Sequence, residues 1–113
     1  MKLSKLALTV LTASSFLLAG SAMADQHTLK EKIQAAMTSD IRSTQETARD
    51  DNRKPLETLA FFGLKPDMHI VELIPGGGWY TKILAPVVAD EGQYYAAIGA
   101  GRVADTLLKE PGF

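Results

Sequence analysis

The sequence predicts an α/β fold in which a β-α-β-α unit follows a helical N-terminal region. The strongest sign is an apolar, β-branched run at residues 68–74 that leads through Pro75 into three glycines and then into a helical pattern. A second short apolar segment, residues 93–98, follows that pattern and ends at another glycine-rich break. Because strands joined through a crossover helix pair in parallel, we expect the two segments to form a parallel pair.

The N-terminal segment, residues 1–24, is typical of a cleaved secretory signal. Two lysines precede an apolar run at residues 6–18 that is rich in leucine and alanine, and the sequence AMA at residues 22–24 fits a cleavage site. The run is shorter than the ~20 residues that a membrane-spanning helix needs, so we expect no membrane span. We therefore predict a periplasmic or secreted chain with a mature N-terminus near Asp25.

The composition narrows the classes of function. Residues 1–24 carry two of the 12 basic residues and none of the 13 acidic ones, so 10 basic and 13 acidic residues remain, a net charge of −3 over 89 residues. This acidic balance makes nucleic acid an unexpected partner, and the length suits one small domain. The chain has no cysteine. Disulfides, thiolate zinc sites and a thiol nucleophile are therefore excluded.

Residues 25–67 are interpreted as an N-terminal helical cap. A first helix is predicted from a capping box in which Thr28 is the N-cap and Glu31 reaches back. Its apolar positions, spaced by four, are Leu29, Ile33 and Met37. A second capping box at Ser43 and Glu46 predicts a short helix that is polar nearly all round and mostly solvated.

Three further helices are expected along the chain. Pro55 suits the first turn of one helix, and Gly63 suits its end. The predicted apolar face of that helix consists of Leu56, Leu59, Ala60 and Phe62. The helix after the glycines is expected to kink or end near Pro86, since proline lacks the N–H that the helix needs. Its apolar face consists of Tyr80, Ile83, Leu84 and Val87. A last helix is expected at residues 102–109.

A sheet of two parallel strands is expected to be unfinished, because both edges expose unpaired backbone groups and the apolar faces lack cover. We expect a fragment or a truncated coding region, with self-association through the unpaired sheet edges. The alternative is a small α+β domain in which the three N-terminal helices cover the two strands.

Residues 42–98 resemble the exported branch of the class I S-adenosylmethionine-dependent methyltransferase family. The resemblance is carried by ARDDNRKPLETLAFFGLKPD followed by VELIPGGGWYTKILAP. It implies that residues 68–113 form an incomplete Rossmann-like unit that binds a cofactor. It also implies a small-molecule ligand, S-adenosylmethionine, and transfer of its methyl group to an acceptor that the sequence does not identify. No residue is assigned a catalytic role.

The resemblance also implies a cofactor site. In the family, the first strand ends in an acid, and glycines at the second, fourth and sixth positions after it form a loop around the cofactor. Glu72 takes the place of the acid, Gly76 and Gly78 match the fourth and sixth positions, and Ile74 replaces the first glycine. Glu72 is thus expected to pair with the amino group of the methionine moiety, while Gly76, Gly77 and Gly78 admit its chain and ribose.

The second acid of the family pattern, which accepts hydrogen bonds from both ribose hydroxyls, is replaced here by Ile98. Two alternatives therefore remain. One is a non-enzymatic periplasmic binding or interaction module, because a fold does not determine its ligand. The other is a dinucleotide-binding fragment, because residues 99–104, GAGRVA, fit the pattern G-x-G-x-x-G/A.

Charged and aromatic residues near the glycines allow two interpretations. A charge run either closes over a ligand at the end of the first strand or forms a solvated helix face, which is favoured. Its members are Arg42, Arg49, Asp50, Asp51, Arg53 and Glu57. Tyr80 is expected in the core, whereas Trp79 is the better candidate for a ligand or interface contact. Neither His27 nor His69 has the spacing of a metal ligand, so no metal site is expected.

Overall fold

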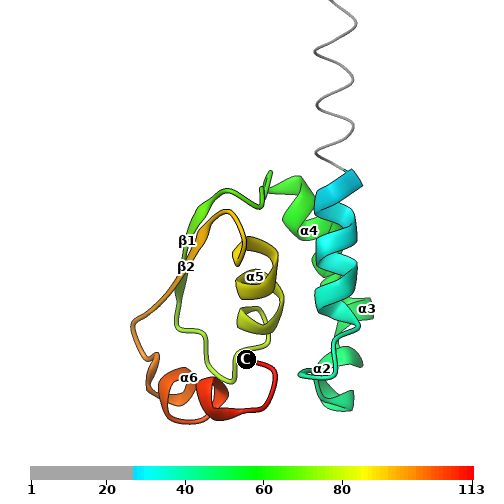
Figure 1. Cartoon of the computed structure of the whole chain (residues 1–113). Helices are drawn as coiled ribbons and strands as arrows, with labels where there is room; N and C mark the ends of the chain where they lie inside the picture. The colour runs from blue at the N-terminus through cyan, green and yellow to red at the C-terminus, as the bar shows by residue number, and fades with distance from the viewer. Residues whose placement is uncertain (1–26) are drawn as a thin grey trace, which may run out of the picture.

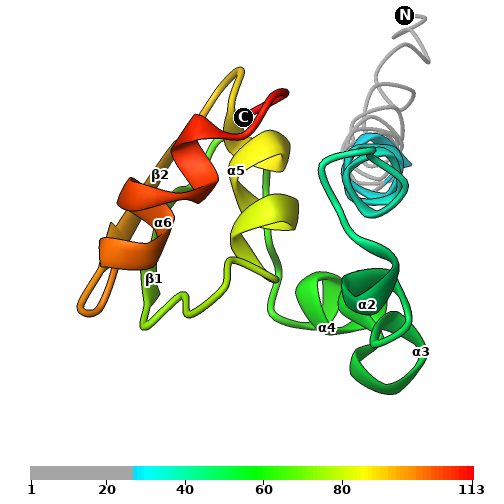
Figure 2. The ribbon, with the colours of Figure 1, turned by 90° about the horizontal axis from the view of Figure 1, so that it is seen from below.

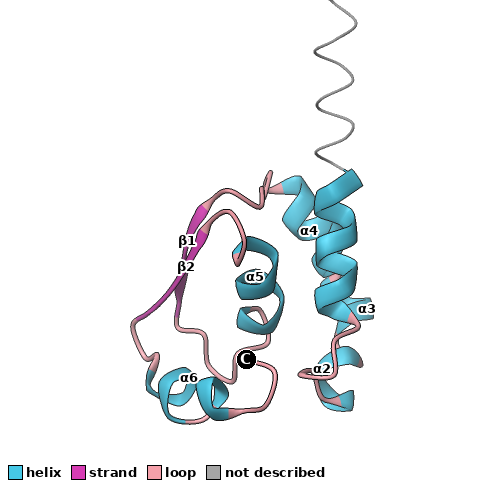
Figure 3. Ribbon diagram, in the orientation of Figure 1, coloured by secondary structure: helices cyan, strands magenta, loops and turns pink. Residues whose placement is uncertain are grey.

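The computed structural model describes residues 27–113, so the predicted signal at residues 1–24 lies outside the described part. The elements follow one another in the order expected of a mixed α/β fold (Figures 1 and 3). They are a helix at residues 27–37, α2 (Thr44–Thr47), α3 (Asp50–Arg53), α4 (Pro55–Phe61), β1 (His69–Leu73), α5 (Thr81–Val88), β2 (Gln93–Ala97), α6 (Gly101–Asp105) and the 3-10 helix η1 (Leu107–Lys109).

The sheet consists of β1 and β2, which pair in parallel with His69 opposite Gln93 and Leu73 opposite Ala97. This confirms the predicted parallel pair. The connecting helix α5 packs against both strands on one side of the sheet (Figure 1). The carboxyl ends of the two strands therefore lie side by side, next to the glycine loop that leads into α5.

The two faces of the sheet differ in cover. On one face, Ile70, Glu72 and Tyr94 are half-buried, and Ile70 and Tyr94 pack against the core. The alternating positions of the opposite face are exposed, namely Val71, Leu73 and Tyr95. The N-terminal helices lie on the far side of α5 from the strands (Figures 1 and 2). The small α+β alternative requires these helices to cover the two strands directly, and they do not.

The core lies between the first helix, α4 and α5. It combines apolar side chains from all three helices and from the segment after α4, namely Leu29, Ile33, Ala36, Leu59, Leu64, Ile83, Leu84, Val87 and Val88. Tyr80 is half-buried against this cluster, in line with the predicted packing role. The apolar side chains that recur every four residues in the first helix thus share one core with the apolar side chains of α5.

The two predicted capping boxes have different outcomes. At α2 the box is present: the Glu46 N–H donates to Ser43 Oγ at 3.3 Å, and the Ser43 N–H donates to Glu46 Oε2 at 2.7 Å. Thr28 is not an N-cap, because residue 27 is already helical and Thr28 lies inside the helix. The polar helix is also split in two, since α2 ends at Thr47 and α3 begins at Asp50.

The helix α4 begins at Pro55, as predicted, and Gly63 follows its end with a left-handed φ of 71°. The predicted apolar face is only partly right. Leu59 is buried, but Ala60 and Phe62 are exposed, Phe62 to 76%. Leu56 is half-buried and packs against the core together with Leu59, whereas Ala60 and Phe62 lie outside that contact.

The helix after the glycines ends near Pro86, as predicted, whereas the last predicted helix is divided in two. Pro86 lies in the final turn of α5, and the helix ends two residues later, at Val88. The helix expected at residues 102–109 divides at Thr106 into α6 and η1, where φ and ψ are −119° and −62°. No helix within residues 27–113 is both long and apolar enough to cross a membrane.

Candidate functional site

A cavity of about 740 Å³ opens at the carboxyl end of β1. The strand, the glycine loop, α3 and α4 all contribute to its walls. Among its lining residues are Arg49, Arg53, Phe62, Glu72, Gly76, Gly77 and Trp79. Three of the four residues expected to hold a cofactor, Glu72, Gly76 and Gly77, therefore lie at one cavity.

The carboxylate of Glu72 is held by hydroxyl groups from two other elements. Thr81 Oγ1 at the start of α5 donates to Glu72 Oε2 at 2.7 Å, and the hydroxyl of Tyr94 on β2 donates to the same oxygen at 2.5 Å. The two hydroxyl oxygens are 3.0 Å apart. Within residues 27–113 no group donates to Glu72 Oε1, which leaves this oxygen as an acceptor.

Tyr94 stays protonated over a wide pH range. Burial and the hydrogen bond to the Glu72 carboxylate both raise its pKa, to about 12, against the smaller opposing effect of Thr81. Sequence reasoning missed both Thr81 and Tyr94. For Tyr94 the sequence held a usable signal, since alternation along the two parallel strands puts residues 72 and 94 on one face of the sheet; no such signal points to Thr81.

The glycine loop divides into two parts with different surroundings. Gly77 has open space around the place of a Cβ and lines the cavity. Gly78 does not line the cavity; its φ is 84°, and a Cβ there would lie 2.6 Å from Leu107 Cδ2. Gly78 is therefore required for close packing against η1, whereas the structure does not place it at the expected cofactor site.

Two isoleucines at the strand ends adopt left-handed backbone conformations. Ile74 and Ile98 each have a φ of 55°, a region that β-branched residues rarely occupy. Position 74 is the one at which the methyltransferase pattern has its first glycine, which would adopt this φ without strain. Ile98 is 68% exposed and does not line the cavity, and neither do residues 99–104.

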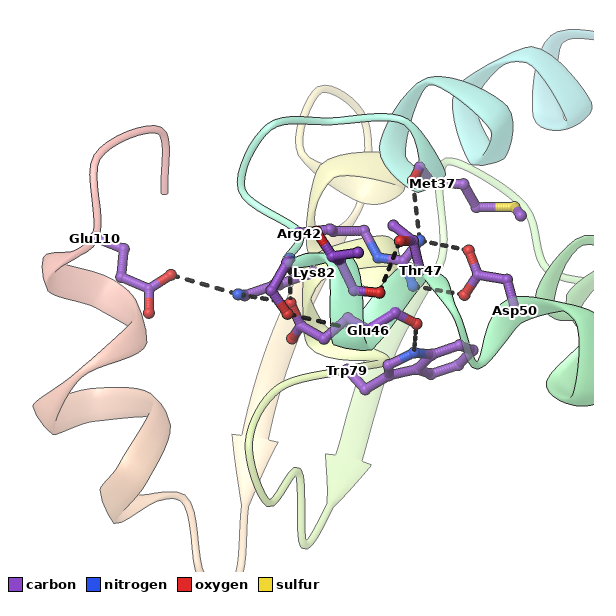
Figure 4. A network of polar contacts seen from close by, with 10 residues as sticks. Met37, Arg42, Glu46, Thr47, Asp50, Trp79, Lys82 and Glu110 are labelled. Atoms are coloured by element: carbon purple, nitrogen blue, oxygen red, sulfur yellow. Dashed lines mark hydrogen bonds and ion pairs between the residues drawn. The ribbon is translucent and has the colours of Figure 1, made fainter.

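Trp79 lines the cavity, but residues of the charge run bury most of its side chain. It is only 6% exposed, and its Nε1–H donates to the backbone oxygen of Glu46 at 2.8 Å (Figure 4). Arg42, Arg49 and Arg53 surround its ring, with Cζ atoms 5.3, 5.9 and 4.7 Å from the centroid. Trp79 therefore forms an interface within the chain, between the loop after β1 and the segment of α2 and α3.

The expectation of a solvated charge run is wrong for Arg42 and Asp50. The Arg42 side chain has no exposed surface, and its two terminal nitrogens each donate to an Asp50 oxygen at 2.7 Å. Arg42 Nη1 also donates to the backbone oxygen of Met37 at 2.9 Å (Figure 4). The pair joins the end of the first helix to the start of α3 across a loop and α2, a relation that helix periodicity does not reveal.

A second buried cation, Lys82, joins α5 to α2 and to the C-terminal segment. Its Nζ lies 3.2 Å from Glu46 Oε2 and 3.4 Å from Glu110 Oε2 (Figure 4). Burial acts to raise the pKa of Glu46, but hydrogen bonds from Ser43 and Lys82 outweigh it and lower the pKa. The ion pair with Lys82 therefore holds Glu46 in place, and Glu46 in turn accepts the hydrogen bond of Trp79 at the cavity wall.

Within the described residues, no group of three or more histidine, cysteine, aspartate or glutamate side chains is arranged to hold a metal ion. His27 Nδ1 lies 3.5 Å from Glu31 Oε2 one helical turn away, and His69 packs edge-on to Tyr95.

Comparisons of the chain with family models, with curated proteins and with solved structures find no match.

Proposed function

We propose that the chain binds an S-adenosylmethionine-type ligand in the cavity at the carboxyl end of β1, as an exported, methyltransferase-like protein with a Rossmann-like unit at residues 68–113. The observation that carries the proposal is the Glu72 carboxylate. Thr81 and Tyr94 fix one of its oxygens, and the other is an acceptor in a residue that lines the cavity beside Gly76.

In this proposal, the free oxygen of Glu72 accepts a hydrogen bond from the ammonium group of the methionine moiety. A carboxylate whose rotamer is already fixed loses little entropy when the ligand binds. Gly76 and Gly77 leave room for the ligand chain next to the backbone. Methyl transfer depends mainly on positioning donor and acceptor, so the proposal assigns no catalytic side chain.

Affinity for the adenosine part is expected to be poor. Ile98 stands where the family has an acid that binds both ribose hydroxyls, and an isoleucine accepts no hydrogen bond. Each missing bond to a charged acceptor is worth roughly 1.5–3 kcal/mol, or about one to two decades in dissociation constant. The same substitution favours the second candidate, a non-enzymatic periplasmic binding module that uses the cavity for another ligand.

Calorimetry with S-adenosylhomocysteine tests the proposal. We expect weak binding by the unaltered chain, no binding by Glu72→Ala and stronger binding by Ile98→Asp. The control is Ile98→Asn, because asparagine and aspartate both tolerate the left-handed φ at this position, and only aspartate carries the charge. If Glu72→Ala leaves binding unchanged and Ile98→Asp gains nothing over Ile98→Asn, the binding module is the better interpretation.

A glycine substitution supplies an independent test of the same site. Gly77→Ala adds a methyl group in open space at the cavity wall, so the thermal midpoint should stay the same while the affinity for S-adenosylhomocysteine falls about tenfold. An unchanged affinity would place the ligand elsewhere.

The proposal includes export and two kinds of partner. The signal at residues 1–24 should be removed, so mass spectrometry of an osmotic-shock fraction should find Asp25 at the N-terminus; finding only the full-length chain in the cytosol would contradict this. The partners are a small-molecule ligand in the cavity and, through the open sheet edges, a second copy of the chain.

A further inference from the structure

Two arginines line the cavity without a carboxylate partner. Arg49 and Arg53 both contribute to its wall, and within residues 27–113 no carboxylate lies within 4.0 Å of either guanidinium. Of the acids in α2 and α3, Asp50 binds Arg42 and Glu46 binds Lys82, whereas Asp51 is exposed and forms no ion pair in the described structure. Both arginines are exposed, so two solvent-facing positive charges at the cavity wall are accessible to a ligand.

Both arginines pack on the ring of Trp79, which orients their guanidinium groups. The indole ring is held by its hydrogen bond to the Glu46 backbone, and Arg53 and Arg49 lie 4.7 and 5.9 Å from its centroid. The two residues are four apart at the two ends of α3, so they share one side of that turn. A guanidinium packed on an aromatic ring keeps its N–H groups free for a planar oxyanion.

We propose that Arg49 and Arg53 form an oxyanion-binding subsite of the cavity, which takes the carboxylate or phosphate group of a ligand. Bidentate contacts from arginine to such groups are among the stronger hydrogen bonds in proteins. The proposal rests on the proposed function only in placing the oxyanion in the cavity that also holds Glu72. The oxyanion is either the α-carboxylate of the S-adenosylmethionine-type ligand or part of a separate anionic acceptor.

The fluorescence of Trp79, the only tryptophan of the chain, reports directly on this subsite. The probe is inorganic phosphate, titrated at constant ionic strength against sodium chloride. We expect a saturable change in emission for the unaltered chain. Arg53→Gln and Arg49→Gln should each weaken phosphate binding by about tenfold or more. The matched control is Arg102→Gln on α6, whose arginine does not line the cavity and whose phosphate binding should be unchanged.

Arg53→Lys, which keeps the charge but not the planar fork, should recover binding only in part. Circular dichroism checks that each variant is folded. A linear response to phosphate in the unaltered chain overturns the proposal, and so does unchanged binding by folded Arg53→Gln and Arg49→Gln.

A second titration separates the two sources of the oxyanion. S-adenosylhomocysteine is compared with its decarboxylated analogue, which keeps the amine and the adenosine. If Arg53→Gln weakens binding of the first ligand and not of the second, the α-carboxylate occupies the subsite. If Arg53→Gln weakens phosphate binding and changes neither adenosine ligand, the oxyanion belongs to an acceptor. Saturable phosphate binding without any binding of S-adenosylhomocysteine supports the subsite and contradicts the proposed function.

Discussion

At the scale of single residues, the carboxylate of Glu72 is the feature on which the site depends. It receives hydroxyl groups from α5 and β2 on the same oxygen, so three elements determine one rotamer. Neither Thr81 nor Tyr94 belongs to a recognisable motif. Their contribution is to keep a charged group oriented at a cavity, which lowers the entropy lost when a ligand binds.

The titration of Tyr94 tests this arrangement. Its pKa in the folded chain, about 12, lies above the ordinary value of 10.0, so the stabilisation is complete below pH 10 and is lost as the pH rises through 12. At neutral pH, Tyr94→Phe should lower the free energy of unfolding by about 1 kcal/mol. Urea unfolding at pH 8 and pH 11.5 should show this difference shrinking as the pH rises.

The control for Tyr94 is its neighbour on β2, Tyr95, which has no hydrogen bond to Glu72 in the described structure. Tyr95→Phe should leave the free energy of unfolding close to that of the unaltered chain at both pH values. A difference between Tyr94→Phe and the unaltered chain that is the same at both values would contradict the raised pKa.

At the scale of elements, buried charge holds the short helices in place. Neither α2 nor α3 has a buried residue of its own, and each has four residues. Helices of one turn are unstable in isolation, so their position depends on contacts with the rest of the chain. The bidentate pair of Arg42 with Asp50 and the contact of Lys82 with Glu46 supply those contacts.

Removal of one partner of the buried pair should be costly. Asp50→Ala leaves the fully buried Arg42 side chain without its counter-charge and should lower the free energy of unfolding by about 3–5 kcal/mol. Asp51→Ala, at the exposed next position with no ion pair in the described structure, should change it by less than about 0.5 kcal/mol. Urea denaturation followed by circular dichroism measures both. Equal effects would show that the pair does not anchor α3.

At the scale of the whole molecule, the sheet is the least protected part. Within residues 27–113 it has two strands, each with an unpaired outer edge, and one of its faces is exposed. The core lies on the other side of α5, among the helices (Figure 2). Like edges of two copies are complementary to each other, because each offers the same alternation of N–H and C=O groups.

Self-association should therefore depend on residues of the strands. In sedimentation velocity, the purified chain should form larger species as its concentration rises. Tyr95→Lys adds a charge to a half-exposed position of β2 and should weaken association about tenfold or more. Leu108→Lys changes an equally exposed apolar residue in η1 and should have little effect. A chain that stays monomeric at all concentrations would contradict the prediction.

Local rules in the sequence were sufficient for several features of the fold. The capping box at Ser43, the start of α4 at Pro55 and the left-handed glycine at position 63 follow from contacts within a few residues. The parallel pair follows from the rule that strands joined through a crossover helix pair in parallel. The same rules placed Glu72, Gly76 and Gly77 at the end of the first strand, where the cavity lies.

Only the tertiary structure decided which polar residues are buried and which helices cover which surface. The Arg42 side chain is buried where Asp50 and the Met37 backbone oxygen accept hydrogen bonds from its two terminal nitrogens, and Trp79 is buried where arginines pack on its ring. Helix periodicity assigns charged residues to solvent, since an unpaired charge is costly to bury. A charge can be buried when its partner is brought beside it, and that pairing depends on how the chain folds back rather than on the residues next to it.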